Sequence, residues 1–210
     1  TQFALHPSAR FTAPRMDPAS EAASDEAVVP VSAAARRTIG ALVLGGMLAM
    51  GTFFGASQAG LTSFALANGL GDSGSLLYAV MAVGSAVATV AMVTVPDRIG
   101  FATRWVLAGV GMALGAVGMM LAPNVGILLV WAVLAGAFQG PALLTIFSVA
   151  GSIAQPGRAG ILMTLTGSGV VMGVAVGTSL GGALAAEGGS TAAFGLVVTA
   201  AGVLAALGVG

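Results

Sequence analysis

From Thr38 onward, the sequence alternates long apolar stretches with short polar breaks. Each stretch approaches or exceeds the roughly 20 residues that an α-helix needs to cross the hydrocarbon core of a bilayer. The breaks contain glycine, proline and asparagine, which are typical of turns, and they carry nearly all the charge beyond Arg37. The pattern predicts six membrane-spanning helices, at about 38–66, 75–95, 104–121, 125–150, 159–184 and 190–209.

Membrane-spanning strands would not account for these stretches. Such strands alternate apolar and polar side chains and close into a barrel, whereas these runs are continuously apolar. The predicted fold class is therefore an all-α membrane protein, with residues 38–210 as a six-helix transmembrane domain embedded in a lipid bilayer.

The basic residues fall only in every second break. All of them are arginines, and they precede the first, third and fifth stretches: Arg10, Arg15, Arg36, Arg37, Arg98, Arg104 and Arg158. The other breaks carry only Asp72, an uncharged Ala122-Pro123-Asn124 and Glu187. Because cytoplasmic loops accumulate arginine and lysine, this alternation predicts that the N-terminal tail and the C-terminus are both cytoplasmic.

The composition excludes several other classes. Hydrophobic residues make up 57% of the chain and charged residues only 7%, whereas a soluble domain has about 25% charged residues. The scattered arginines make no basic patch, so no nucleic-acid partner is expected. The absence of cysteine and the single His6 leave little material for a metal site, a cofactor or a catalytic nucleophile. Arginine without lysine, beside abundant alanine, glycine and valine, suggests a GC-rich bacterium and its cytoplasmic membrane.

Residues 1–37 form a separate region. They contain four prolines and the acidic cluster Glu21, Asp25 and Glu26, so they should bury little surface and form a flexible cytoplasmic linker or tail. No short apolar core follows a basic start, as a secretory signal would require. Since no methionine stands at position 1, we expect that Thr1 is not the natural start of the protein.

The most polar side chains within the predicted spans are two glutamines. No span has an ionisable residue other than tyrosine in its interior, so the segment supplies no proton relay of its own. Gln58 lies late in the first span and Gln139 near the middle of the fourth, where each amide needs a hydrogen-bond partner. Each glutamine could serve either to hold two helices together or to contact a substrate. Pro141 follows closely after Gln139 and should kink the fourth span.

Glycines recur at every fourth position of the fifth span, at Gly169, Gly173, Gly177 and Gly181. They share one helix face, so another helix can approach closely, either within this segment or from elsewhere.

A weaker repeat relates the first and fourth spans. Gly51–Gly55 and Gly136–Gly140 share the pattern Gly-x-Phe-x-Gly. It is either a coincidence in a glycine-rich chain or a trace of two three-helix repeats with opposite membrane topology, as transporters often have.

The second arginine-bearing break has a recognisable sequence, Asp97-Arg98-Ile99-Gly100 followed by Arg104. It resembles the Asp-Arg-x-Gly loop of the major facilitator superfamily of transporters. The match is partial, because Val93 stands where the family has a leading glycine and Arg104 is displaced from the usual basic pair. With the six spans, the preceding basic linker and the glycine-rich fifth span, the whole chain resembles the C-terminal six-span half of that family.

The resemblance implies roles for two groups of residues. Spans one, two, four and five would border a central cavity, with these candidate residues: Phe54, Gln58, Phe138 and Gln139. An inner-gate loop would include Asp97, Arg98, Gly100, Arg104 and Arg158, although plain topology setting also accounts for the arginines. The N-terminal six-span half of the same polypeptide and a small-molecule substrate would be the partners.

The function expected from this resemblance is secondary transport by alternating access, with small-molecule efflux by proton exchange as the commonest theme. The coupling acid would come from the other half of the protein. A complete six-span channel and a half-transporter that dimerises remain alternatives. An intramembrane serine protease is not expected, because the only histidine is His6.

Overall fold

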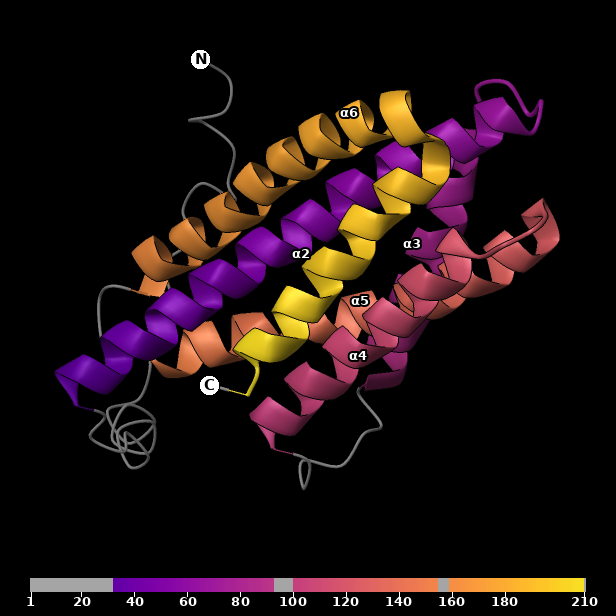
Figure 1. The fold of residues 1–210 in the computed structure, drawn as a ribbon. Helices are drawn as coiled ribbons and strands as arrows, with labels where there is room; N and C mark the ends of the chain where they lie inside the picture. The colour runs from indigo at the N-terminus through magenta and orange to yellow at the C-terminus, as the bar shows by residue number, and fades with distance from the viewer. Residues whose placement is uncertain (1–31, 93–99, 155–158, 210) are drawn as a thin grey trace, which may run out of the picture. The chain divides into compact units, whose positions relative to one another are not determined.

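A computed structural model describes residues 32–92, 100–154 and 159–209. The chain divides into two units, Thr1–Ser32 and Ala33–Gly210, and the described helices belong to the second. In chain order they are α2 (Ala33–Ala67), α3 (Gly74–Ala91), α4 (Phe101–Met120), α5 (Val125–Ser152) and α6 (Ala159–Leu207) (Figure 1).

All five helices are long and apolar enough to cross a membrane, and the described ranges contain no strand. This confirms the all-α class and the membrane-crossing length of the apolar stretches. The helix starts differ slightly from the prediction. α2 begins at Ala33 rather than near residue 38, because the alanines and arginines that precede Thr38 are strong helix formers.

The largest difference concerns the last two predicted spans. We expected separate helices at 159–184 and 190–209, but one element, α6, covers both, with non-helical backbone only at Gly189. Its φ of 67° and ψ of −166° suit glycine, which has no Cβ to clash. The predicted break is therefore present as a single residue and not as a loop.

α6 reverses its direction at this residue. Gly169 lies against Met47 and Gly181 against Ala56, so the first segment runs along α2 in the same direction. Beyond Gly189, Phe194 lies against Gly60 and Leu207 against Gly45, so the second segment runs the opposite way. Figure 1 shows α6 turning back on itself beside α2.

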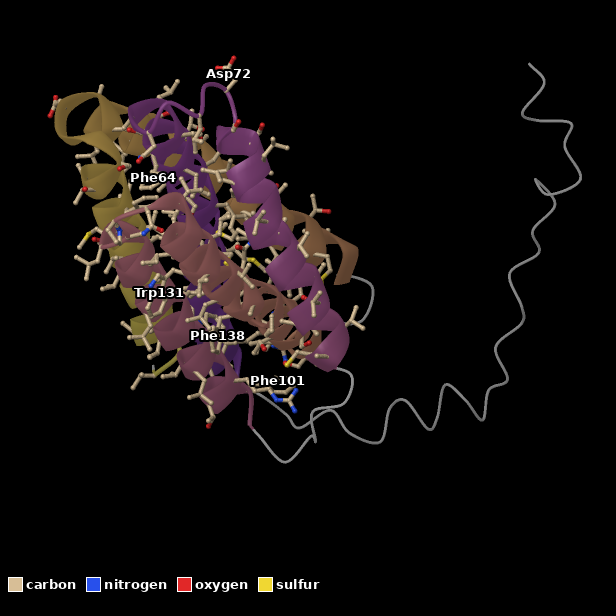
Figure 2. All side chains as sticks on the ribbon, turned by 90° about the vertical axis from the view of Figure 1, so that its right-hand side faces the viewer. Phe64, Asp72, Phe101, Trp131 and Phe138 are labelled. Carbon is tan, nitrogen blue, oxygen red and sulfur yellow. The ribbon has the colours of Figure 1, made fainter. Side chains whose placement is uncertain are left out.

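The first half of α2, the start of α4 and the end of α6 pack together toward one end of the bundle. The Trp105 ring covers Gly46 of α2 and Gly208 after α6, and it is only 5% exposed. Figure 2 shows Phe101, the first residue of α4, at this end and Asp72 at the other. Among the described residues, the arginines therefore lie toward one end, and Asp72 lies at the opposite end.

The interior is apolar, and so is much of the outside. In the part of the chain that the structure describes, 27 buried hydrophobic residues form one cluster, whose bulk comes from methionines and phenylalanines such as Met50, Phe53, Met112 and Phe194. Leucines and valines remain exposed on the outer faces of α3 to α6. An outward apolar surface of this kind suits lipid tails and would not suit water.

Candidate functional site

A groove of about 550 Å³ lies between α2 and the first segment of α6. Its lining residues on α2 are Gln58, Ala59, Thr62, Ser63 and Leu66, and on α6 they are Thr178, Gly182, Ala185 and Ala186. Phe64, which lies among these α2 residues in the sequence, is toward the Asp72 end of the bundle in Figure 2. The volume falls within the range of small-molecule sites, which is roughly 300–1,000 Å³.

The groove exists because α6 approaches α2 closely just before it and carries only small side chains along it. At Gly177, an added Cβ would lie 2.8 Å from the Cα of Thr52, closer than real side chains come. Farther along, Gly182, Ala185 and Ala186 project little from α6, so space remains beside Gln58. The same glycine-rich pattern thus produces both the close contact and the groove.

Two polar side chains in the groove have no partner within the described part of the chain, Gln58 and Ser63. The two threonines differ: Thr62 Oγ1 donates to the Gln58 carbonyl oxygen at 2.8 Å, and Thr178 Oγ1 donates to that of Val174. Their hydroxyl protons are therefore used within the helices. The Gln58 carboxamide and the Ser63 hydroxyl remain available to a solute, and none of the lining residues is charged.

Gln139 has a different environment. Its side chain is 8% exposed within the bundle, and its Oε1 has no hydrogen-bond partner. Ser57 on α2 is fully buried, and its Oγ is also without a partner. Neither residue lines the groove. A buried polar atom without a partner costs about 1–3 kcal/mol, so these two atoms mark polar points inside an apolar core.

The two phenylalanine candidates pack against other parts of the helices. Phe54 contacts Phe53 edge to face, with ring centroids 6.4 Å apart and an angle of 71° between the planes. The Phe138 ring lies over Gly111 of α4. Of the four predicted cavity residues, only Gln58 lines the groove, so the structure does not gather the four into one pocket.

The glycine ladder of α6 lies against α2, a partner that the sequence left open. At Gly173, an added Cβ would overlap the Leu48 carbonyl oxygen and lie 2.9 Å from the Gly51 Cα. At Gly51, an added Cβ would likewise overlap the backbone of α6, at Val170. Glycines on both helices therefore let the two backbones touch.

A second close contact, which sequence analysis missed, joins α3 and α5. At Gly136, an added Cβ would overlap the Met81 carbonyl oxygen. At Gly140, an added Cβ would lie 2.7 Å from the Ser85 carbonyl oxygen. From the other side, an added Cβ at Gly84 would lie 2.5 Å from the Val133 carbonyl oxygen. The small pair Gly84-Ser85 in a valine-rich helix was the signal that could have indicated it.

Most of the predicted inner-gate loop, namely Asp97, Arg98 and Arg158, lies outside the described residues. Gly100 immediately precedes α4, with a φ of −60° and a ψ of 155°. Its carbonyl oxygen accepts a hydrogen bond from the Arg104 amide at 3.1 Å, which begins the first helical turn. The Arg104 side chain is partly buried at the end of the bundle where α4 starts.

No family model matches the sequence, and no curated protein matches it significantly. The class that the fold defines is an α-helical membrane protein with several apolar helices of membrane-crossing length. Its features within the described residues include close backbone contacts that glycines make between α2 and α6, α3 and α5, α4 and α5, and α4 and α6, and a groove without charged lining residues.

Proposed function

We propose that this chain is the C-terminal six-span half of a secondary transporter of the major facilitator type. Its substrate is a small molecule, which it exports by alternating access in exchange for protons. The acid that couples protons to transport lies in the N-terminal half, since the one acidic residue within the described helices, Glu187, is exposed beside the turn of α6 at Gly189. The protein resides in the cytoplasmic membrane of a bacterium, with the tail and the C-terminus in the cytoplasm.

The observation that carries this proposal is a match between two of the glycine contacts, the one between α2 and α6 and the one between α3 and α5. Residues of α2 and their counterparts in α5 are separated by one constant interval: Leu48 and Val133, Gly51 and Gly136, Gly55 and Gly140. Residues of α3 and their counterparts in α6 are separated by a second constant interval: Met81 and Val170, Gly84 and Gly173, Ser85 and Val174, Thr89 and Thr178.

Counterpart residues make the same contacts. Gly51 lies against the carbonyl oxygen of Val170, and Gly136 lies against that of Met81. Gly173 lies against the carbonyl oxygen of Leu48, just as Gly84 lies against that of Val133. Chance placement of glycines would not reproduce both sides of both contacts, so the match supports two three-helix repeats.

The helix directions support an inverted relationship between these repeats. α2 starts at the end of the bundle where the arginines lie, whereas α5 follows α4 and starts at the opposite end. The reversal of α6 at Gly189 supplies the last two spans of the second repeat, which brings the proposed number to six. Repeats of opposite topology are the architecture from which many secondary transporters are built.

Paired cysteine labelling in the full-length natural protein tests the proposal. Ser63→Cys places a thiol in the groove. Ser148→Cys places one on an exposed face of α5, near the C-terminal end of that helix. N-ethylmaleimide labelling is compared in energised cells and in cells treated with a protonophore. Alternating access requires the two labelling rates to change in opposite directions. Rates that change together, as in a channel, or not at all would reject the transporter.

A further inference from the structure

The depth of Gln58 in its helix requires an explanation. At about 1.5 Å per residue, Gln58 lies about 14 Å from the end of α2 at Ala67, and no charged residue lies between them. Its side chain is nevertheless exposed and has no partner within the described residues. Leaving a carboxamide in hydrocarbon without a hydrogen bond costs several kcal/mol, so Gln58 is poorly suited to face lipid.

The groove beside Gln58 provides a place for the missing partner. The carboxamide offers two donors and an acceptor, and the Ser63 hydroxyl offers a donor and an acceptor nearby on the same helix. Leu66, Ala59, Ala185 and Ala186 supply the apolar remainder of the lining. Such a mixture fits a compact solute with both apolar surface and hydrogen-bonding groups.

The charges around the groove decide the class of solute. None of the lining residues is ionisable, and the described arginines lie in the opposite part of the bundle. Glu187 follows Ala186 in the sequence, but it is exposed and does not line the groove. An ionised solute would lose part of its hydration here and gain no opposite charge from the lining. Hydroxyl, amide and carbonyl groups, in contrast, can all pair with Gln58 and Ser63.

We infer that the groove between α2 and α6 binds an uncharged, hydrogen-bonding small molecule through Gln58 and Ser63, which names the substrate class and rests on the proposed transporter function. Gln58 is then a binding residue. Gln139 and Ser57, which are buried away from the groove, do not contact the ligand at this site.

Thiol reagents of different charge test this inference in the full-length protein. Ser63→Cys reports on the groove, and Pro123→Cys, on the exposed turn before α5, provides the reference. Hydroxyethyl, trimethylammonium-ethyl and sulfonatoethyl methanethiosulfonates are compared at both positions. After normalisation to Pro123→Cys, the neutral reagent should react about tenfold faster than either charged reagent at Ser63→Cys. Equal normalised rates, or a faster charged reagent, would overturn the inference.

A second variant isolates Gln58. In the Ser63→Cys protein, Gln58→Leu should lower the rate of the hydroxyethyl reagent relative to propyl methanethiosulfonate by about fivefold, because one hydrogen bond is lost. Leu44→Met changes an exposed residue of α2 that does not line the groove and should leave this ratio unchanged. An unchanged ratio in Gln58→Leu would remove Gln58 from the binding site.

The two proposals fail in different ways. Reagent selectivity needs no energised membrane, whereas alternating access is measured as a reciprocal change in labelling. If the neutral reagent is preferred but the two labelling rates do not change in opposite directions, transport is rejected and a site for neutral solutes is kept. If the labelling rates change in opposite directions but no reagent is preferred, transport is kept and this solute class is rejected.

Discussion

The indole Nε1 of Trp105 donates a hydrogen bond to the Leu204 carbonyl oxygen, at 2.8 Å, and thereby joins the start of α4 to the end of α6. In a longer helix, this carbonyl would accept from the Gly208 amide, but that amide donates to Ala205 instead. The last carbonyls of a helix need partners from outside the helix, and the indole provides one. Trp105 thus acts as a cap as well as a packing residue.

We expect Trp105→Phe to lower the thermal stability of the purified protein in detergent. The variant removes the indole donor and part of the ring, so a loss of at least about 1 kcal/mol is expected. Trp131→Phe is the matched control, because Trp131 packs over Gly118 but has no hydrogen bond within the described residues. Equal losses in the two variants would show that the hydrogen bond contributes nothing.

Replacing glycines at the close contact should have effects that depend on position. Gly173→Ala forces a methyl group into the backbone of α2 and should cost about 1–3 kcal/mol, measured as a lower unfolding midpoint. Gly182 lies on the same segment with open space around it, so Gly182→Ala should be neutral or gain up to about 1 kcal/mol. Similar stability in the two variants would contradict the close contact between α2 and α6.

The turn at Gly189 should depend on its backbone conformation alone. No atom lies within 4 Å of a Cβ added there, but the φ of 67° is strained for any residue with a side chain. Gly189→Ala should therefore cost about 1–3 kcal/mol in unfolding free energy. Gly195→Ala, in the helix that follows, has equal space and no positive φ, so it should not destabilise the protein. If Gly189→Ala is as stable as the control, the chain does not reverse through this conformation.

Gln139→Leu should leave the stability of the protein unchanged or raise it. The side-chain oxygen is buried without a partner, and replacing such a group with an apolar one of similar shape removes a cost of about 1–3 kcal/mol. The unfolding midpoint in detergent provides the measurement. A clear loss of stability would mean that Gln139 makes hydrogen bonds that help to hold the bundle together.

The proposed orientation can be tested by labelling with an impermeant maleimide on intact cells, because the sequence has no cysteine of its own. Asp72→Cys, Pro123→Cys and Glu187→Cys should react from outside, since these exposed positions lie in the breaks without arginine. Thr103→Cys, exposed at the start of α4, should react only after lysis. The reverse result would invert the topology.

The sequence predicts the helices well but not their neighbours. Pro123-Asn124 and the glycines after Ala67 mark real helix ends, because turn residues and charges cannot continue an apolar span. The pairing of α3 with α5 could not be predicted in the same way. Every face of these helices is apolar, so hydrophobic periodicity does not distinguish an inward face from a lipid-facing one.

The candidate site was predictable only in part. Gln58 and Gln139 are the same residue type in similar spans, yet one lines a groove and the other is buried in the bundle. The difference arises from the small residues of α6 beside Gln58, which lie far away in the sequence. Phe138 likewise packs on Gly111, a contact set by helix direction and not by local pattern.

The single-residue reversal at Gly189 also bears on how the protein enters the membrane. In the proposed topology each segment of α6 is a span, and no loop separates the two. We therefore expect them to be inserted together as a helical hairpin, with Glu187 next to its tip. One glycine would thus couple the insertion of two spans.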